Sequence, residues 1–510
     1  KGKTPIAAVS RPNCTLGARS ETLHRGDKRD LSARGSAHSG KFHFMAASGS
    51  GHENWSSRSA FILAAVGSAV GLGNMWRFPA EAGENGGGAF VLFYIFCVLL
   101  IGLPVLLSEV LIGRHGQANA PESVRRLARD SNAPEGWSIL ASLGVFAAFL
   151  ILSFYCVVGG WVVYYIGVFV SDLIQTGLSG GAFEGRAAED VEGLLPALFG
   201  DGGLMVALNL GFLAVTMFFV ARGVSSGIEW VAVYLMPLFF ALFLGITIYG
   251  AFTGNFGEAV SYLFTFDFSK LTGEVMLAAV GQAFFSLSLG VAGMMTYGAY
   301  ANRETNLAET SGIIASADTA VAMLAGLAIF PIVFAAGLSA SAGPGLMFQS
   351  LPIAFQAMPF GSLIGLLFFT MVFFAALTSS VSLLEAPVAW VFEKFNLKRP
   401  VATIIVGGGA AVLGVFSSLS FNEMAEFYPL GFIPIFAEAN FFDALDGVTA
   451  KLFMPIGAIL TCVFVGWIAD AKLIDQENGL DGALHMLWRA LVRFVCPVVL
   501  VVIMLVGLFG

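Results

Sequence analysis

Charged residues are scarce in this chain of 510 residues. Asp, Glu, Lys and Arg make up 12% of it and hydrophobic residues 57%, whereas a soluble protein of this size needs far more charge around its core. Apolar runs of about 20 residues or more recur along the chain, and this length crosses about 30 Å of hydrocarbon. Because a backbone in lipid must satisfy its own polar groups, these runs predict an all-α polytopic membrane protein.

Cysteine is also sparse, and its spacing excludes several kinds of site. The five cysteines are scattered and four of them lie in apolar runs, so neither a disulfide framework nor the spacing of metal ligands is present. The chain also lacks a nucleophile with a nearby base, a metal-ligand cluster and a phosphate-binding loop. We therefore expect that the protein is not an enzyme and that it has no nucleic-acid partner.

Residues 1–52 lack any apolar period and are polar, basic and rich in Ser and Gly. Such a segment cannot bury enough surface to offset its conformational entropy. It also lacks the apolar core of about 7 to 15 residues that a secretory signal requires. We expect a disordered cytoplasmic segment here, and Met45 is a candidate for the natural start of the chain.

Residues 53–510 form the predicted membrane domain, with about eleven spans. The basic loop residues Arg125, Arg126, Lys398 and Arg399 favour a cytoplasmic N-terminus, and an odd number of spans then places the C-terminus outside. The loop after the tenth span is acidic where this rule expects it to be basic. The predicted spans cover approximately residues 58–80, 88–113, 138–172, 203–221, 228–252, 275–301, 308–339, 361–394, 401–418, 447–470 and 484–509.

Two of these spans are interrupted by glycine and polar residues. The first interruption is Gly67–Pro79 and the second is Ser286–Tyr297, in the first and sixth spans. Each half contains five spans, an odd number, so the second half starts on the opposite side of the membrane and the repeats are inverted. The repeats cover about residues 55–252 and 275–470, with an extra helix at 484–509. Paired broken helices indicate a binding site near the bilayer midplane of a secondary transporter.

Four longer motifs stand in sequence along the chain, namely Gly67–Pro79, Glu84–Phe90 (ENGGGAF), Gly281–Gly290 (GQAFFSLSLG) and Ala375–Ser380 (AALTSS). A single glycine motif would indicate only helix packing. In this order the four motifs resemble the neurotransmitter:sodium symporter family, in its bacterial amino-acid branch. The resemblance covers about residues 52–510 and implies the leucine-transporter fold, sodium-driven uptake, alternating access and a bacterial inner-membrane location.

Sodium is a hard cation, so oxygen ligands should hold it. In the eighth span, Ala375, Thr378 and Ser379 are spaced so that a carbonyl and two hydroxyls share one helical face. The resemblance implies two sodium sites. One comprises Gly67, Val70, Ala375, Thr378 and Ser379, and the other comprises Ala69, Asn74, Ser286 and Asp318.

Asp318 is a carboxylate within an apolar span, which is costly in lipid and indicates a functional site. Chloride-dependent relatives have Asn at this position and Ser four residues on, where this chain has Ala322. Tyr94, Gln282 and Ser286 otherwise resemble the residues of the anion site. A fixed charge at Asp318 would replace the anion, so we expect transport without chloride.

The breaks also predict the substrate. Freed amides at Leu72 and Gly73 suit a carboxylate, and Tyr155 resembles a tyrosine that binds the same group. Relatives that carry monoamines have Asp at the position of Gly71, so this chain should take a substrate with its own carboxylate. The remaining pocket residues are mostly apolar, which favours a neutral, mostly hydrophobic amino acid. By resemblance they are Ser68, Ile151, Phe285, Ser288, Val291 and Leu383.

The resemblance also implies two gates. Arg77 and Asp446 resemble the outer charge pair, and Phe285 with Tyr155 resembles the aromatic lid beneath it. At the inner gate, His52 stands where relatives have Arg, and Glu393 stands where they have Asp. Tyr300 is also available to the inner network. Glu109, a buried carboxylate of the second span, is expected to bond the unwound backbone of the first break.

Other classes of function fit the same chain less well. A channel would use continuous pore-lining helices with rings of like polar residues. A sensor on the same fold, or a symporter with a proton gradient or another substrate, would keep the two broken helices. Sodium dependence of uptake separates these alternatives. The sequence predicts neither the oligomeric state nor the exact amino acid.

Overall fold

The computed structural model describes residues 53–178, 180–343 and 345–509, and every regular element in them is helical. They belong to one compact unit, Gly51–Gly510. The predicted disorder of the N-terminal segment, His52 included, lies outside the described residues.

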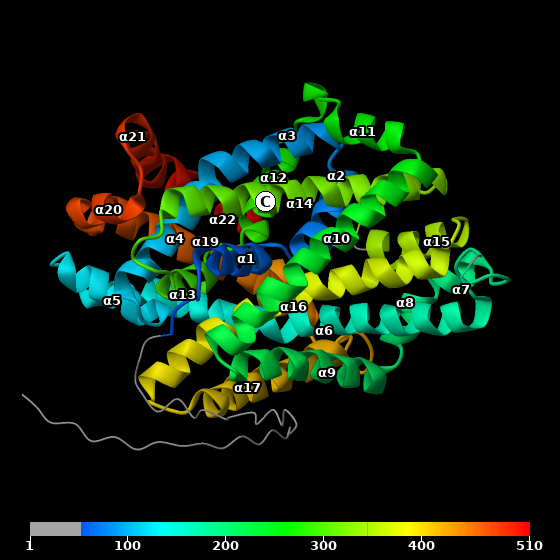
Figure 1. The fold of residues 1–510 in the computed structure, drawn as a ribbon, viewed down its shortest axis with the longest axis horizontal. Helices are drawn as coiled ribbons and strands as arrows, with labels where there is room; N and C mark the ends of the chain where they lie inside the picture. The colour runs from blue at the N-terminus through cyan, green and yellow to red at the C-terminus, as the bar shows by residue number, and fades with distance from the viewer. Residues whose placement is uncertain (1–52, 179, 344, 510) are drawn as a thin grey trace, which may run out of the picture. The chain divides into compact units, whose positions relative to one another are not determined.

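The first half contains the first broken span and four further spans (Figure 1). Three short helices and a π-helical turn lie between or within them. The elements are α1 (Arg58–Ala69), the turn Gly73–Arg77, α2 (Phe78–Glu84), α3 (Gly88–Cys97), α4 (Leu103–Gly116), α5 (Ala120–Asp130), α6 (Ile139–Thr176), α7 (Ala188–Glu192), α8 (Leu194–Phe199), α9 (Gly202–Ala221) and α10 (Glu229–Thr253).

The second half begins with a short helix and then repeats the pattern of a broken span. Its elements are α11 (Phe256–Phe264), α12 (Gly273–Ser286), α13 (Gly293–Ala299), α14 (Leu307–Ala335), α15 (Leu351–Gln356), α16 (Gly361–Lys394), α17 (Arg399–Leu419), α18 (Phe441–Val448), α19 (Met454–Val463), α20 (Ala471–Asn478), α21 (Gly482–Ala490) and α22 (Cys496–Phe509). π-Helical turns join several helices of both halves. They are Val98–Gly102 and Val224–Ile228 in the first half, and Thr449–Phe453, Phe464–Ile468 and Leu491–Val495 in the second.

The helices satisfy the length and apolarity required of membrane spans. In the described part of the chain, nine helices are long and apolar enough to cross a membrane, or ten if α1 and the helix after it, bent by 49°, count as one span. The predicted span at 275–301 is divided into α12 and α13, because residues Leu287–Ala292 between them are not helical. Both predicted interruptions therefore exist as breaks in the helices.

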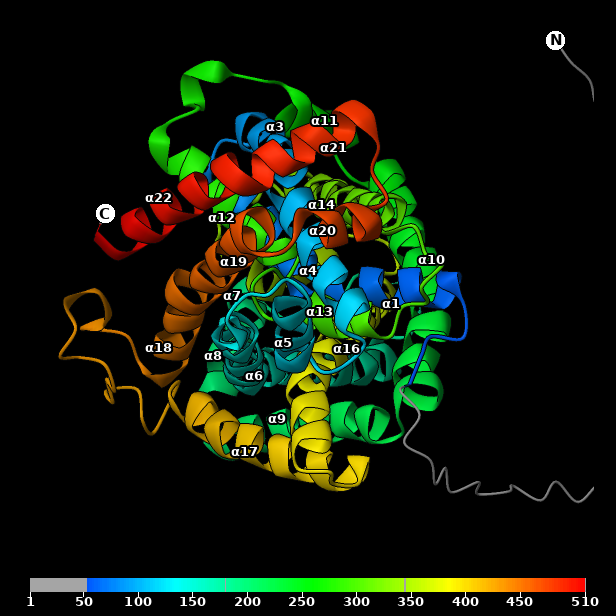
Figure 2. The same ribbon diagram turned by 90° about the vertical axis from the view of Figure 1, so that its left-hand side faces the viewer.

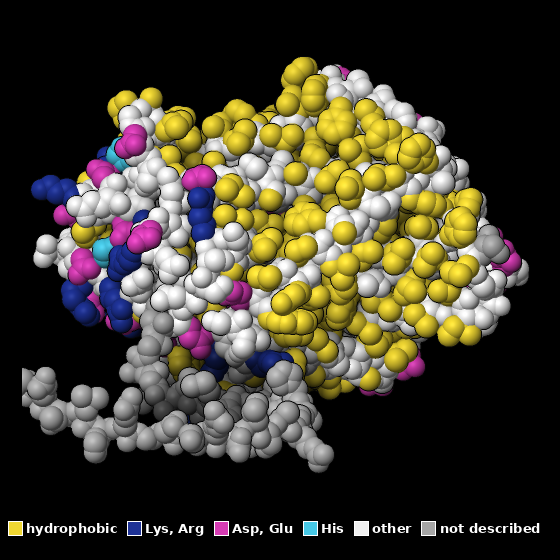
Figure 3. Space-filling view, in the orientation of Figure 1, with side chains coloured by type: hydrophobic (Ala, Val, Ile, Leu, Met, Phe, Trp, Pro, Cys, Tyr) yellow, Lys and Arg dark blue, Asp and Glu magenta, His cyan; other side chains and the backbone are white. Residues whose placement is uncertain are grey.

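The broken helices lie among the long ones. α6 packs along α16, and α1 contacts α10, α14 and α16. Viewed along the long axis, α9 and α17 lie at one edge and α22 lies outside α19 (Figure 2). Hydrophobic side chains cover most of the visible surface, whereas charged side chains gather at the end where α5 and α20 lie (Figure 3). The hydrophobic surface away from that charged end is the part that hydrocarbon would cover.

Two glycines bring α4 and α13 into backbone contact. A Cβ added at Gly113 of α4 would overlap the carbonyl oxygen of Met295, and one at Gly298 of α13 would lie 2.5 Å from the carbonyl oxygen of Val110. Small residues on both helices allow this approach, as is typical of helix packing in membranes.

The acidic loop after the tenth span lies against basic residues of other loops. Glu477 of α20 forms ion pairs with Arg114, at 2.7 Å, and with Arg303, at 3.1 Å. Burial alone would raise the pKa of Glu477, but the hydrogen bond from His115 and the charge of Arg114 outweigh it and hold the pKa below its ordinary value. Glu477, one of the acids that opposed the basic-loop rule, is thus a partner of the basic residues.

We predict that Glu477→Gln lowers the melting temperature of the purified protein at pH 7, with a loss of roughly 1.5–3 kcal/mol typical of charged hydrogen bonds. Because the folded-state pKa is depressed, the stabilisation exists above the ordinary carboxyl pKa of about 4.3 and is lost as the pH falls through the folded-state value. Melting curves of both proteins from pH 7 to pH 3.5 test this.

Asp475→Asn is the matched control, because the Asp475 side chain is 44% exposed in its pair with Arg489 and such pairs contribute little. Equal melting temperatures of the parent and Glu477→Gln at pH 7 would contradict the prediction.

Candidate functional site

The first break leaves carbonyl oxygens that converge on one hydroxyl. The oxygens of Gly67, Ser68 and Val70 lie 3.3, 3.3 and 3.2 Å from Ser379 Oγ of α16. They are free because the last carbonyls of α1 have no partner within the helix. A hydroxyl has one proton and cannot satisfy three acceptors, so this oxygen cluster suits a cation.

Thr378 and Ala375 complete the predicted set at this position. Thr378 Oγ1 donates to the Ala375 carbonyl at 3.0 Å, and Thr378 Cβ lies 3.2 Å from the position of a Cβ at Gly67. The structure thus brings together the five residues predicted for this sodium site, Gly67, Val70, Ala375, Thr378 and Ser379. Their role as ligands stays a prediction.

Asp318 accepts hydrogen bonds from both broken helices. Asn74 Nδ2 lies 2.8 Å from Oδ1 and Ser286 Oγ 2.7 Å from Oδ2, and Tyr94 Oη lies 3.5 Å from Oδ2. All four side chains are at most 1% exposed. These donors are neutral, and of the described residues no Lys or Arg forms an ion pair with this carboxylate. A buried carboxylate with only neutral donors favours a bound cation.

Ala69, the fourth residue predicted for this second set, ends α1 and lines a cavity beside the cluster. Asn74 Oδ1 also accepts the N–H of Gly71, at 3.1 Å. Asn74 therefore connects the backbone of the first break to the carboxylate of α14.

A cavity of about 40 Å³ lies between the two breaks. Tyr155 Oη lies at this cavity and accepts the N–H of Leu72 at 3.3 Å. Met454 of α19 also lines the cavity and was missed, because a Met in an apolar run usually indicates packing. All nine residues predicted for the substrate line this cavity, namely Ser68, Leu72, Gly73, Ile151, Tyr155, Phe285, Ser288, Val291 and Leu383.

Gly71 has no room for a side chain. A Cβ at this position would overlap Ser379 Oγ and lie 3.0 Å from Tyr155 Oη. The absence of an acid here is therefore also a steric requirement in this arrangement of helices.

The second break is held open by strained backbone and by Glu109. Ser288 and Ala292 have φ of 52° and 57°, a region that non-glycine residues rarely occupy. Glu109 Oε1 accepts the N–H of Gly290 at 2.7 Å. The expected bond from Glu109 to the first break is therefore wrong, because its partner belongs to the second break.

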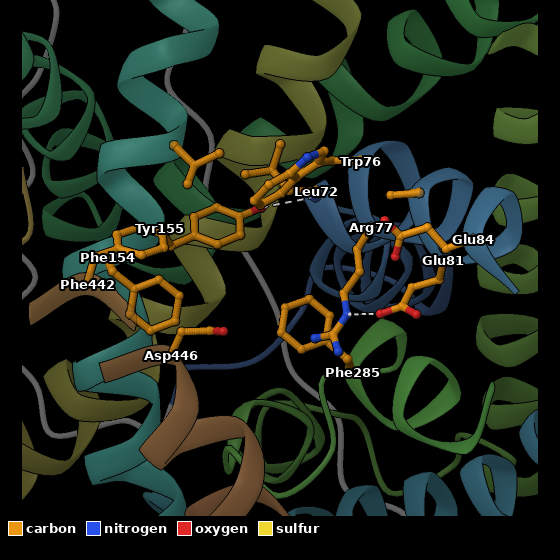
Figure 4. A pocket seen from close by; sticks show the side chains of 12 residues that line it. Leu72, Trp76, Arg77, Glu81, Glu84, Phe154, Tyr155, Phe285, Phe442 and Asp446 are labelled. Atoms are coloured by element: carbon orange, nitrogen blue, oxygen red, sulfur yellow. Dashed lines mark hydrogen bonds and ion pairs between the residues drawn. The ribbon is translucent and has the colours of Figure 1, made fainter. Parts of the chain in front are cut away.

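The two residues predicted for the outer gate are not paired with each other. Arg77 lies 3.4 Å from Glu81 and 4.6 Å above the ring of Phe285. Asp446 lies across a cavity of about 230 Å³ that it lines together with Arg77, Phe285 and Tyr155 (Figure 4). The predicted pair of Arg77 with Asp446 is not formed in this conformation, and its place is taken by the pair with Glu81.

The described residues predicted for the inner gate have other partners than those expected. Glu393 accepts hydrogen bonds from the backbone and side chain of Asn119, at 2.8 and 2.7 Å, and His52 lies outside the described residues. Tyr300 donates to Glu385 at 2.5 Å, as expected for an inner network, and Glu385 also pairs with Arg399.

Sequence reasoning missed Arg399 and Glu53, which pair at 3.1 Å. The signal for Arg399 was available, since a carboxylate within a span, here Glu385, requires a partner. Trp55 lies nearby and donates to the carbonyl oxygens of Tyr297 and Tyr300, at 3.0 and 3.1 Å.

The fold and this site define a secondary transporter of the leucine-transporter fold, with a central site between two broken helices. The model of the sodium:neurotransmitter symporter family matches residues 52–176 and 200–509. The chain belongs to this family and is a sodium-dependent, multi-pass membrane symporter.

Individual relatives and a solved structure are also similar to this chain over most of its length. An uncharacterised sodium-dependent transporter of Bacillus subtilis, YhdH, is 35% identical over 88% of this chain and 96% of its own length. One from Haemophilus influenzae is 31% identical over 90% and 98%. The crystal structure of MhsT in complex with L-phenylalanine has a TM-score of 0.80 and 38% identity, covering 90% of this chain and 100% of that chain.

We predict that Gly71→Ala lowers sodium-dependent substrate binding at least about tenfold, because the new methyl group must displace Ser379 or Tyr155 from a packed site. Gly408→Ala is the control, since a Cβ there meets nothing within 4 Å. Binding of labelled amino acids to purified protein, with and without sodium, tests this. Parent-like binding by Gly71→Ala would show that the break tolerates a side chain.

Proposed function

We propose that the protein imports neutral, mostly hydrophobic amino acids with sodium by alternating access. The observation that carries this proposal is the neutral hydrogen-bonding around Asp318, next to a cavity lined by freed backbone. A bound sodium ion would neutralise the carboxylate, and a substrate carboxylate would occupy the adjacent helix end. The location would be a bacterial inner membrane, with the N-terminus cytoplasmic and the C-terminus outside.

Two sodium ions would bind. The first would use Ala69, Asn74, Ser286 and Asp318 beside the substrate, and the second would use the carbonyls of Gly67 and Val70 with Ala375, Thr378 and Ser379. Oxygen ligands in both sets fit a hard cation. The second set joins α1 to α16, so sodium there would hold the first broken helix against the helix it must move past.

The cavity supports the choice of substrate. The backbone of Leu72 and Gly73 and the phenol of Tyr155 would bind the carboxylate, while Ile151, Val291 and other apolar side chains would surround the substrate side chain. The phenylalanine bound by MhsT supports a large apolar substrate. Contacts of this kind separate similar aliphatic substrates by only about 1–3 kcal/mol, so we propose a class of amino acids.

The conformation supports alternating access. The outer cavity is separated from the substrate cavity by Phe285 and Tyr155, which line both, while Trp55 and the pair of Glu385 with Arg399 close the inner end. This arrangement is that of an outward-facing state. Sodium and substrate would change its equilibrium with the inward-facing state through contacts that differ between the two.

Uptake of labelled amino acids into proteoliposomes tests the proposal. An inward sodium gradient should drive uptake, and an equal potassium gradient should not. Uptake that ignores sodium and follows a proton gradient would instead indicate another symporter of this fold. Rapid conductance independent of any gradient would indicate a channel.

We also predict that replacing chloride with gluconate leaves the uptake rate unchanged within about twofold, because Asp318 supplies the negative charge beside the sodium ions. Rates measured in the two media at fixed sodium test this. Uptake that stops in gluconate would rule out transport without chloride.

Substitution of Asp318 provides a sharper measurement. Asp318→Ala should abolish sodium-coupled uptake while the protein stays folded, as judged by its elution from a sizing column. Asp318→Asn keeps an oxygen but loses the charge, so its uptake should fall at least about tenfold in gluconate and recover partly with chloride. Near-normal sodium dependence of Asp318→Ala would refute the ligand role.

A further inference from the structure

Arg77 at the outer gate has a carboxylate partner on its own helix. Its Nε donates to Glu81 Oε1 at 3.4 Å, one helical turn further on. The guanidinium lies over Phe285 at 4.6 Å from the ring centroid. Figure 4 shows this pair on one side of the cavity and Asp446 on the other.

Glu81 is itself held in place. Asn85 Nδ2 donates to Glu81 Oε2 at 3.1 Å and to the carbonyl oxygen of Glu81 at 2.9 Å. The Glu81 side chain is 23% exposed and that of Arg77 is 33% exposed, so neither charge is fully solvated. A carboxylate fixed by its neighbour loses little conformational entropy when Arg77 binds it.

Asp446 is a further acid that lines the same cavity as Arg77. It comes from α18, and Arg77 and Asp446 both line a second cavity, of about 350 Å³, which extends behind the gate to α22. Contact between Arg77 and Asp446 would close the passage above Phe285. Because Arg77 would have to leave Glu81 to cross the cavity, the two pairs belong to different states of the gate.

We propose that Glu81 is a positioning residue of the outer gate, whose carboxylate holds Arg77 away from Asp446 and so favours the open state. The inference rests on the proposed function, because it assumes that this cavity is the entry path of a transporter. Closure exchanges one carboxylate for another, which keeps Arg77 paired in both states. Only the difference in free energy between the Arg77–Glu81 pair and the Arg77–Asp446 pair then opposes closure.

The size of this free-energy difference depends on how far the ion pairs are exposed to solvent. Partly exposed ion pairs change an equilibrium by roughly 1.4- to 5-fold. Removal of Glu81 and removal of Asp446 should therefore shift the gate by similar factors in opposite directions. A role of Glu81 in folding alone would not produce this reversal of sign.

The experiment measures access to the outer cavity without substrate. Ala80 lines the cavity, so Ala80→Cys introduces a thiol there, while the four native cysteines in the described residues are buried. A charged, membrane-impermeant thiol reagent is added to right-side-out vesicles containing sodium. The chain without Ala80→Cys gives the background.

In the Ala80→Cys protein, Glu81→Gln should slow labelling by roughly 1.4- to 5-fold, and Asp446→Asn should speed it by a similar factor. In a background that also carries Arg77→Ala, Glu81→Gln should have no effect, because the side chain through which it acts is absent. Glu258→Gln is the control, since Glu258 is an exposed carboxylate of α11 whose side chain contacts Asn255.

Unchanged or faster labelling of Glu81→Gln would overturn the inference, as would an equal effect of Glu81→Gln with and without Arg77. The proposed function is judged separately, by sodium-driven uptake in the parent protein without Ala80→Cys. Uptake by this parent together with unchanged labelling of Glu81→Gln would reject the role of Glu81 alone. Absence of sodium-driven uptake would reject the proposed function.

Discussion

Backbone polar groups exposed by two helix breaks must be satisfied in the middle of a membrane, and the core is arranged around this requirement. The N–H groups of Gly71, Leu72 and Gly290 are bound by side chains from three places, Asn74, Tyr155 and Glu109, at 3.1, 3.3 and 2.7 Å. Gln282 donates to the carbonyl oxygen of Gly73 at 2.9 Å. These polar residues stand in otherwise apolar helices because the breaks need them, and the groups that remain under-satisfied form the binding site.

Three buried carboxylates illustrate how the free-energy cost of burying a polar group is offset in different ways. Glu385 has a cationic partner in Arg399, and Glu109 binds a backbone N–H of the second break. Asp318 has only neutral donors. Of these three acids, Asp318 accepts side-chain hydrogen bonds from both broken helices beside the candidate substrate cavity, and this is where we propose that an ion from solution binds. A carboxylate without a cationic partner beside the proposed substrate would give a simple physical basis for coupling.

Much of this arrangement could be predicted from the sequence. Gly67–Pro79 and Ser286–Tyr297 interrupt apolar runs, and an acid in a third run is rare enough to mark the site. The partners in the gates could not be predicted in the same way. Arg77 has two acids within reach, and the conformation decides between Glu81 and Asp446. Glu477 meets Arg114 across more than three hundred residues, so charge counts in loops could not reveal the pair.

The partner of Glu109 and the lining residue Met454 were missed for a related reason. Periodicity places a residue on a face of its own helix, but it does not say which of two breaks that face meets. Both broken helices are rich in glycine, and α4 passes close enough to the second break for Glu109 to reach Gly290. Only the packing of the helices decides whether Glu109 reaches the first break or the second.

The close contact of α4 with α13 has a consequence for motion. Gly113 and Gly298 set each backbone against the other, and two surfaces that interlock at both ends of a short interface cannot slide past one another without separating. The inner half of the second broken helix should therefore travel with α4 as one rigid piece. Any opening toward the cytoplasm must then occur at other helix interfaces. The interface between α1 and its neighbours is one of these, because hydrogen bonds rather than interlocked backbone hold it.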